Sequence, residues 1–452
     1  EWIEGWKTKD KVIEWKLDAQ ECPSWDERQE TETILKENLE EKELDYLSGL
    51  LKNPDQRVRQ KAQFELAKRE DDGAAVFEDN ISQKDHQLAR IHGIIGLSQL
   101  ARLENKSYAE PLVPLLKDAD AEIRAQAAKW LGDIKYAEAG DNFIPLLKDN
   151  NSRVRFFAAE ALGRIAYEPA FTNLVDLLAS NNDEDAFLRH AASLALARIG
   201  KSEPLVDLAD HSSPAVRLGA VLALRRMSHP GIENFLEDVS EYIVTEAARA
   251  INDDFSIEDA LPALGNLLVV SPFANEALIR RAINANLRVG TPEALENLLQ
   301  YSKNDSAPLA MRTEALEALG TWANPSVLDR VDGRHRGEIN RDLSLVQTAS
   351  LDHLLQLLSH KEKEMRMYAA MAIGKLELSE ASAQLLALLN GDSDAEVRIA
   401  SLKSLAVLEG APMDQAIEQA LSDPNKDVRV AGLDLLDNLD IPKDLAVDLL
   451  TE

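Results

Sequence analysis

The chain has 452 residues, which exceeds the size at which one hydrophobic core keeps growing, so several domains or a repeat array are expected. Its 79 acidic residues outnumber its 50 lysines and arginines, and the net charge of −29 argues against nucleic acid or anionic lipid as a general partner. The single cysteine, Cys22, excludes an internal disulfide and an all-thiolate metal site.

Residues 1–20 predict a β-hairpin, in contrast to everything that follows. The stretch EWIEGWKTKDKVIEWKL places β-forming side chains in two short runs on either side of a polar turn. Trp2, Trp6 and Trp15 lie in these runs. A two-stranded hairpin is marginally stable by itself, so these three side chains are expected to form a seam against another apolar surface.

From residue 44 to residue 440 the sequence predicts about twelve pairs of helices, which follow a linker or first helix over 21–43. One pattern recurs in the second helix of each pair. An apolar residue is followed by Arg, then by small residues three and six positions later and usually by Leu seven positions later. Examples are AEIRAQAAKWL at Arg124, SRVRFFAAEAL at Arg155 and AEVRIASLKSL at Arg398. An upstream amphipathic segment, such as PLVPLLKD (111–118), is expected to form the first helix of each pair.

The spacing of this pattern places the small and apolar side chains on one face of a helix with 3.6 residues per turn. One pair cannot bury both of its faces, so the pairs should stack into an all-α, right-handed superhelix. The repeated Arg is expected to bind the preceding turn or a neighbouring repeat, which would form a ladder of hydrogen bonds along the array. Residues in these turns that are suited to begin the second helices are Asp55, Asp120, Asn151, Asp394 and Asp423.

Two segments depart from the repeat pattern and are candidate interfaces. They are EAARAINDD (246–254) and RRAINANLR (280–288), in which amides stand among apolar helix positions. Buried amides cost stability unless they are paired, so these side chains either bond a neighbouring turn or face a partner protein. The candidate interface residues in the two segments are Arg249, Asn252, Asp253, Arg280, Arg281, Asn284 and Asn286.

An insertion at 323–345 interrupts the array between Arg312 and Arg366. Its segment DRVDGRHRGEINRD is rich in arginine and acid, and long insertions in repeat arrays often make contacts. One interpretation is a solvated loop with internal ion pairs. The other is docking, in which the guanidinium groups bind acidic groups on an adjacent domain. The candidate interface residues of the insertion are Arg330, Arg334, His335, Arg336 and Arg341.

The recurring second helix resembles that of HEAT repeats over roughly residues 44–440. A narrower likeness involves EWIEGWKTKDKVIEWKL, which resembles the closing strands of a sorbosone-dehydrogenase-like β-propeller. NPDQRVRQKAQFELAKR, RRAINANLRVGTPE and NPSVLDRVDGRHRG resemble the helical region that follows this propeller in large exported redox proteins. In that family a c-type cytochrome domain usually comes next. The resemblance implies the helical middle of a larger periplasmic or otherwise exported protein, and residues 441–452, which begin a further helix, agree with that expectation.

The sequence contains no motif that predicts an active site or a cofactor. Eight histidines are scattered without metal-ligand spacing, and the phosphate-binding and nucleophile-elbow motifs are absent. The C-x-x-C-H motif for covalent haem attachment is also absent. No apolar run predicts membrane insertion, and no signal segment is recognised.

Two classes of function remain. The first is a non-catalytic solenoid that holds protein partners together, either an adjacent β-propeller or cytochrome domain or separate subunits. The second is an enzyme or chaperone, because some HEAT-like proteins attach bilins or excise damaged DNA bases. The strong negative charge argues against DNA chemistry. We therefore expect a scaffold, with the chain itself not an enzyme and with a bilin lyase as the alternative.

Overall fold

The computed structural model describes residues 25–438 with the exception of residue 104. The predicted hairpin at 1–20, with its seam of Trp2, Trp6 and Trp15, and the predicted helix at 441–452 lie outside the described residues. The described chain consists of helices and connecting segments, with one isolated β-bridge between Leu328 and His335. It divides into two compact units, one extending to Gly200 and the other beginning at Lys201.

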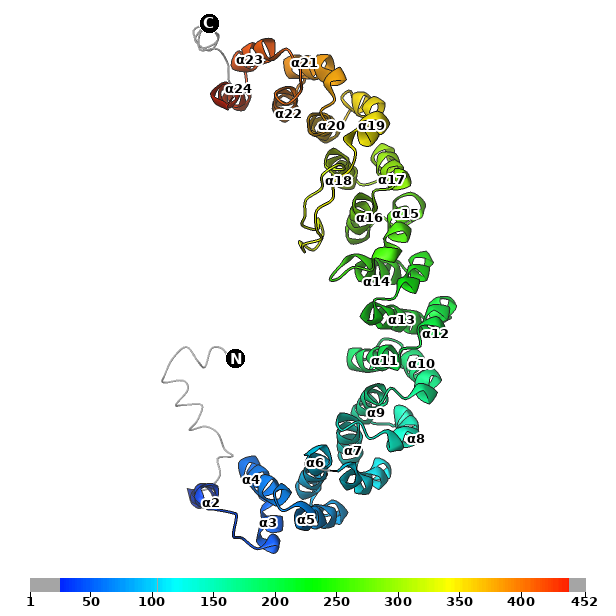
Figure 1. The fold of residues 1–452 in the computed structure, drawn as a ribbon, viewed down its shortest axis with the longest axis vertical. Coiled ribbons are helices and arrows are strands. Elements are labelled where there is room, and N and C mark those ends of the chain that lie inside the picture. The colour runs from blue at the N-terminus through cyan, green and yellow to red at the C-terminus, as the bar shows by residue number, and fades with distance from the viewer. Residues whose placement is uncertain (1–24, 104, 439–452) are drawn as a thin grey trace. The chain divides into compact units, whose positions relative to one another are not determined.

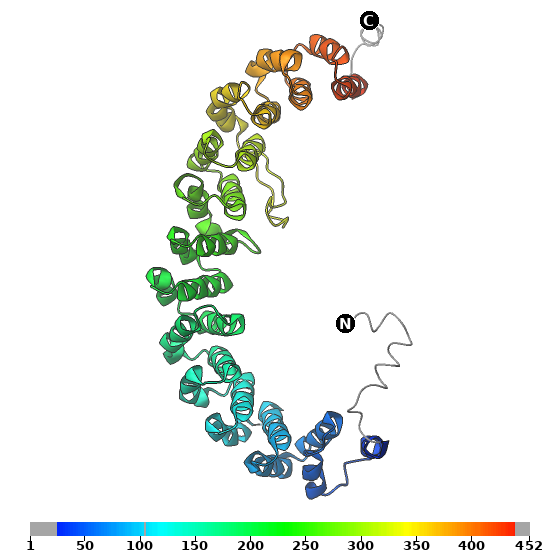
Figure 2. The same ribbon diagram turned by 180° about the vertical axis from the view of Figure 1, so that it is seen from behind.

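The first unit is built from α-helices and short 3₁₀ helices (Figures 1 and 2). Its α-helices are α2 (Trp25–Lys36), α3 (Leu44–Leu50), α4 (Gln56–Ala67), α5 (Glu70–Ser82), α6 (Gln87–Leu103), α7 (Ala121–Asp133), α8 (Gly140–Phe143), α9 (Ser152–Arg164), α10 (Phe171–Asn181) and α11 (Ala186–Ile199). Its 3₁₀ helices are η1 (Lys106–Lys117), η2 (Ala137–Ala139), η3 (Ile144–Lys148) and η4 (Glu168–Ala170). The helices with the repeated Arg, which are α4, α6, α7, α9 and α11, pack each against the next.

The second unit continues the same arrangement of paired helices. Its α-helices are α12 (Ser202–Val206), α13 (Pro214–Met227), α14 (Glu241–Asn252), α15 (Leu261–Val270), α16 (Glu276–Val289), α17 (Pro292–Lys303), α18 (Leu309–Gly320), α19 (Leu343–Leu357), α20 (Lys363–Lys375), α21 (Ser382–Gly391), α22 (Ala395–Leu405), α23 (Met413–Leu421) and α24 (Lys426–Asn438). Its 3₁₀ helices are η5 (Asp207–Asp210), η6 (Pro230–Glu237), η7 (Glu258–Ala260) and η8 (Ser379–Ala381). The second helices α13, α14, α16, α18, α20, α22 and α24 pack in series.

The second helices lie close together because the residues that face each other have small side chains. Leu131 and Leu162, each seven residues after a repeated Arg, are fully buried. A Cβ added at Gly132 of α7 would stand 2.7 Å from the Cα of Ala161 in α9, which is closer than side chains pack. The predicted core face of the second helix is confirmed at these positions, and burying it provides the main stabilisation of the stack.

The first helix of several pairs differs from the prediction. The segment 111–118 was expected to be an amphipathic α-helix, but it belongs to the 3₁₀ helix η1. Pro111 and Pro114 lie inside η1, and neither has a backbone N–H to donate to an α-helical hydrogen bond. The amphipathic pattern still places Leu112 and Leu116 in the core. The pattern therefore identified the buried face correctly and the helix type wrongly.

The repeated arginines form the predicted ladder. In α7, Nε and Nη2 of Arg124 donate to the carboxylate of Asp149 at 2.8 and 3.0 Å, while Nη1 donates to the carbonyl of Asp118 at 2.7 Å. Asp149 lies in the turn of the next repeat and also accepts a hydrogen bond from the backbone N–H of Asn151. The same pairing through Nε and Nη2 joins Arg217 to Asp238, Arg366 to Asp392 and Arg398 to Asp423.

Most of the residues predicted to begin the second helices do accept hydrogen bonds from the first N–H groups of those helices. The four residues whose side chains accept N-terminal N–H groups as predicted are Asp55, Asp120, Asn151 and Asp394. Asp423 is the exception, because it serves as the ladder partner of Arg398. Asn425 accepts from the N–H of Asp427 at the start of α24 instead.

Candidate functional site

The insertion forms a loop that returns across its own unit. Residues 321–342 connect α18 to α19, and we call them the crossing loop. In Figure 1 the loop leaves α18, runs beside α16 and reaches the end of α14. Its two arms are joined by backbone hydrogen bonds from Asp329 N to Arg334 O and from Arg336 N to Val327 O, each 2.8 Å long. These bonds hold the loop tip in a fixed shape.

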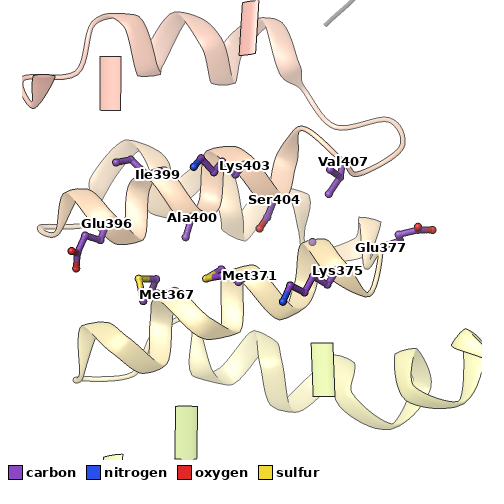
Figure 3. A pocket seen from close by; sticks show the side chains of 11 residues that line it. Met367, Met371, Lys375, Glu377, Glu396, Ile399, Ala400, Lys403, Ser404 and Val407 are labelled. Carbon is purple, nitrogen blue, oxygen red and sulfur yellow. The ribbon is translucent and has the colours of Figure 1, made fainter. Parts of the chain in front are cut away.

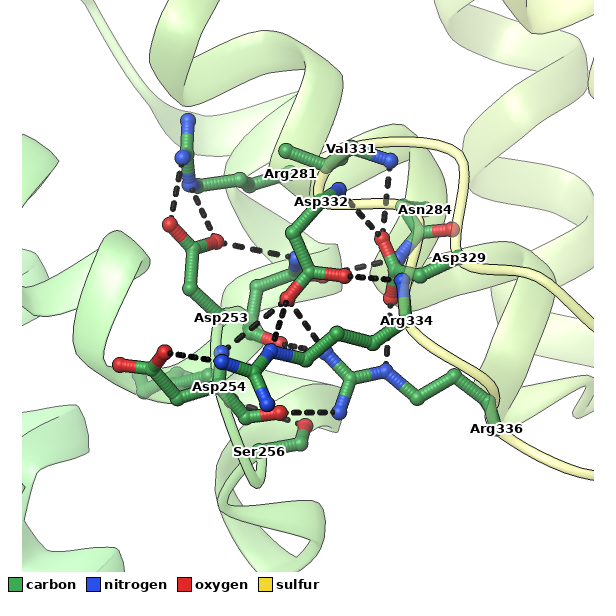
Figure 4. A network of polar contacts seen from close by, with 12 residues as sticks. Asp253, Asp254, Ser256, Arg281, Asn284, Asp329, Val331, Asp332, Arg334 and Arg336 are labelled. Carbon is green, nitrogen blue, oxygen red and sulfur yellow. Dashed lines mark hydrogen bonds and ion pairs between the residues drawn. The ribbon is translucent and has the colours of Figure 1, made fainter.

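Asp329 is the centre of the contact between the crossing loop and the helices (Figure 4). Its side chain is 0% exposed and accepts hydrogen bonds from Asn284 Nδ2 of α16 and from Arg336 Nε, both at 3.0 Å. Burial by itself would raise the pKa of Asp329, but hydrogen bonds from the N–H of Val331, from Arg336 and from Asn284 outweigh it and hold the pKa below its usual range. The buried carboxylate therefore remains charged and paired.

Arg336 ties the crossing loop to the end of α14. Its Nη1 donates to the carbonyl of Asp254 at 2.7 Å, and its Nη2 donates to the carbonyl of Asn252 at 2.9 Å. Arg334 reaches the carboxylate of Asp254 at 3.1 Å and lies over the ring of Phe255, yet its side chain remains 51% exposed. The two arginines thus contact the same turn, one in a buried position and one at the surface.

The other two arginines of the insertion also bind within the chain. Arg341 donates from Nη2 to the carbonyls of Leu287 and Arg288 at the end of α16, and from Nη1 to the carbonyl of Trp322. Arg330 pairs with Glu317 of α18 at 2.6 Å. Arg330 thus forms an ion pair within the chain, whereas Arg341 binds backbone carbonyls. His335 is exposed at the loop tip, where its backbone forms the bridge to Leu328.

The amides predicted in 280–288 bond to neighbouring segments. Asn284 donates to Asn252 Oδ1 at 2.8 Å as well as to Asp329. Asn286 donates to the carbonyls of Gly265 and Ala282, both at 2.8 Å. Of the two alternatives for these amides, the structure shows bonding within the chain.

The candidate interface residues do not form one surface. Asn252, Asp253, Arg281, Asn284 and the insertion residues come together around the crossing loop, and Arg281 pairs with Asp253 at 2.6 Å. By contrast, Arg249 pairs with Glu246 on its own helix, and Arg280 pairs with Glu276 and Glu314. The crossing loop is therefore a contact between three repeats, and most of its polar groups have partners inside the chain.

A groove between α20 and α22 is a second candidate site, which the sequence analysis missed (Figure 3). It has a volume of about 600 Å³, and its floor consists of Met367 and Met371 from α20 and Ile399 and Ala400 from α22. Val407, just beyond α22, extends the apolar lining and is 61% exposed. No single position of the repeat marks this groove, because other repeats also carry apolar residues one or five positions after the Arg, such as Leu218 and Leu222 after Arg217.

Two lysines flank this groove. Lys375 comes from α20 and Lys403 from α22, and no ion pair joins either of them to another described residue. Two glutamates lie toward the ends of the groove in Figure 3, and Glu396 is paired with Lys363 at 2.9 Å. The groove thus combines an adaptable apolar floor with two cations that have no carboxylate partner in the described part of the chain.

Within the described residues the structure holds no cluster of three or more side chains suited to bind a metal ion. No helix in that part of the chain is both long and apolar enough to span a membrane. Two hollows in the described part of the chain are the groove between α20 and α22 and a polar cavity beside α9.

Known proteins share features of this sequence and fold. The family model for HEAT repeats matches residues 109–197, 308–406 and 351–437. A search of curated proteins finds no match. Among solved structures, the chain is similar to importin beta at 14% identity, covering 87% of this chain and 60% of that one, with a TM-score of 0.39. It is also similar to Kap121p bound to Ste12p at 12% identity, covering 94% of this chain and 46% of that one, with a TM-score of 0.47.

A further similarity is to the complex of CpcE and CpcF of phycocyanin lyase from Nostoc sp. PCC7120, at 23% identity over 47% of this chain and 86% of that chain, with a TM-score of 0.25. The chain spans less than two thirds of the importin beta and Kap121p chains that it matches. The family-model matches agree with the stacked pairs and the arginine ladder described above. The chain carries HEAT repeats, and its described part folds as an all-helical HEAT-like solenoid.

Proposed function

We propose that this chain is a non-catalytic scaffold that binds other proteins, and that the groove between α20 and α22 receives an amphipathic helix of a partner. The observation that supports this function most directly is the partly exposed apolar floor of Met367, Met371 and Ile399. Buried packing explains apolar residues on the core face of these helices, but these side chains lie on the opposite, open side. Methionine adapts to irregular partners, and it is common at surfaces that bind helices.

The charges beside the groove specify the partner further. Lys375 and Lys403 stand on its two walls with no carboxylate partner among the described residues. Acidic side chains on the partner helix would form ion pairs with them. The groove runs along α20 and α22, which lie side by side in Figure 3, and such a trough suits a third helix. The partner is therefore an amphipathic helix with one apolar face and glutamate or aspartate beside it.

A labelled peptide tests this function. The probe is a designed amphipathic helix with leucine on one face and glutamate on the flanks, and its counterpart carries lysine in place of glutamate. Fluorescence anisotropy should show that the acidic peptide binds more tightly than the lysine peptide. Met371→Arg should weaken the affinity for the acidic peptide at least tenfold. Leu222→Arg is the matched control, because Leu222 occupies the same position of its repeat in α13. Equal binding by the Met371 variant, or a preference for the lysine peptide, would contradict the proposal.

We further propose that the chain works within a larger exported, dehydrogenase-like electron-transfer protein, as a periplasmic scaffold between its domains. The support is the likeness of EWIEGWKTKDKVIEWKL to propeller-closing strands, together with the segments that resemble the helical region after such a propeller. Intact mass and a visible absorption spectrum of natively purified material test this context. A haem-coloured species well above 50.0 kDa is expected. A colourless species of that mass, or one with a bilin spectrum, would contradict it.

A further inference from the structure

Two ladder arginines of the first unit, Arg59 and Arg155, have no carboxylate partner among the described residues, and Arg155 lies beside a cavity. Arg155 of α9 donates from Nη1 to the carbonyl of Asp149 at 2.7 Å, as the other ladder arginines do toward their own turns. Arg124, Arg366 and Arg398 also use Nε and Nη2 to bind an aspartate of the next repeat. Nε and Nη2 of Arg155 have no such partner among the described residues. The edge of the guanidinium that binds carboxylate elsewhere is open here.

The turn after α10 explains the missing partner. Asn182 and Asp183 both adopt left-handed backbone conformations, with φ of 45° and 61°, which lengthens the turn before α11. Asp183 therefore pairs with Arg189 of its own repeat and not with Arg155. The ladder aspartate cannot reach back across this longer turn.

An amide stands in the place of that aspartate. Oδ1 of Asn181 accepts the N–H of Asp185 in the turn, as Oδ1 of Asp149 accepts the N–H of Asn151 in a regular repeat. Nδ2 of Asn181 donates to the carbonyl of Asp185 at 3.0 Å. Asn181 thus keeps the turn contact of a ladder residue but supplies no negative charge to Arg155.

The space beside this open rung is a cavity of about 790 Å³. Arg155 and Asn181 both line it, and Lys148, Asn173 and Ser180 add further polar groups. Its acidic residues are Asp149, which is already bound to Arg124, and Asp176, which is exposed at the surface. Two cations therefore face one unpaired carboxylate, and this balance suits a ligand with a single negative charge better than a phosphate.

We infer that this cavity is a binding site for a carboxylate group, which Nε and Nη2 of Arg155 hold with two parallel hydrogen bonds. The chain repeats this geometry internally with Asp149, Asp238, Asp392 and Asp423, so the preferred ligand of the guanidinium edge is known from its own neighbours. The carboxylate comes either from a small carboxylic acid or from an acidic side chain of a protein. The site lies in the first unit, apart from the groove of the proposed function, and is independent of it.

NMR of the full chain labelled with ¹⁵N-arginine tests the inference. The Nε–Hε signal of Arg155, assigned by its loss in Arg155→Gln, should shift in a saturable way on addition of acetate, succinate or the peptide acetyl-Gly-Asp-Gly-amide. Sodium chloride at matched ionic strength should leave it in place. Tighter binding of succinate would identify a small acid as the source, and tighter binding of the peptide would identify a protein side chain.

Two variants make the test decisive. Asn181→Asp restores the ladder carboxylate, so it should lose at least tenfold in acetate affinity while raising the melting temperature. Asn150→Asp adds the same charge to the cavity wall outside the ladder, and it should weaken binding by less than threefold. The inference is overturned if Arg155 does not respond, if phosphate binds more tightly than acetate, or if the two variants behave alike.

Discussion

Gly163 of α9 lies directly against Ala195 of α11, so that a Cβ at Gly163 would stand 2.6 Å from the Cα of Ala195. The closest atom belongs to the backbone of α11 and cannot move aside, whereas the flexible side chain of Arg198 lies farther away, at 3.4 Å. Gly163→Ala should destabilise the first unit by about 1–3 kcal/mol, because overpacking forces the two helices apart. Urea unfolding followed by circular dichroism measures the change.

Gly49→Ala is the control for this prediction. Gly49 lies in α3 of the same unit, and nothing stands within 4 Å of the position of its added Cβ. This substitution should leave stability unchanged or raise it by about 0.5–1 kcal/mol, since alanine is the better helix former. Equal destabilisation by both variants would show that the spacing between α9 and α11 is not the cause.

The ladder should contribute measurably to stability. Asp392 and Arg366 are 4% and 13% exposed, and Asp392→Asn would leave the guanidinium without its charged partner. We expect a loss of about 3 kcal/mol in the second unit, within the usual range for breaking a buried pair. Thermal unfolding measures it, with Glu362→Gln as the control, because the pair of Glu362 with Lys361 is exposed and should contribute nothing measurable. A loss no larger than that of the control would refute the ladder's role.

Arg334 and Arg336 should behave differently despite their neighbouring positions. Arg336→Gln removes buried bonds to Asp329 and to the end of α14, so amides of the crossing loop should exchange with deuterium at least tenfold faster. Arg334→Gln removes a contact that is half exposed, and exchange should change less than threefold. Hydrogen exchange with mass spectrometry compares the two, and the reverse order would mean that the surface arginine anchors the loop.

The two buried histidines should make the protein sensitive to mild acid. Burial lowers the pKa of His92 in the first unit and of His353 in the second from 6.5 to about 4. Each ring is therefore neutral in the folded chain and protonates more readily when unfolded. The stability that depends on the neutral ring is complete above pH 6.5 and is lost as the pH falls toward 4, by about 2 kcal/mol per histidine at pH 5.

The two units supply controls for each other in this measurement. His92 donates from Nδ1 to Oε1 of Gln63 at 2.8 Å, while His353 bonds Ser302 at 2.8 Å. His92→Gln should flatten the stability of the first unit between pH 7 and pH 5 and leave the second unit sensitive. Unfolding at several pH values, with a fluorescent probe in each unit, distinguishes them. An unchanged slope in the first unit would exclude His92 as the titrating group.

The sequence predicted features that depend on short-range spacing. The core face, the caps at Asp120 and Asn151 and the ladder arginines all lie within one helix and its turn, so periodicity reveals them. It failed for the helix type of η1, where proline outweighed amphipathicity. It also assigned Asp423 to a helix start, because the same residue type serves both as a cap and as a ladder partner.

The candidate sites were harder to predict because their partners are distant in sequence. Arg336 binds Asn252 and Asp254, more than 80 residues earlier in the chain, and no local pattern indicates that pairing. The groove needs α20 and α22 to stand beside each other, so Met371 appeared to be an ordinary helix residue. The open rung at Arg155 required the left-handed turn at Asn182, a backbone conformation that the repeat pattern does not show.

The crossing loop has a mechanical consequence. A solenoid in which each repeat contacts only its neighbours can be pulled apart one repeat at a time. The crossing loop bonds α14, α16 and α18 together through Asn252, Asn284 and Glu317, so under tension these three layers would yield as one block. Pulled from its ends, the second unit would extend in small steps, except for one larger step where the loop tears free.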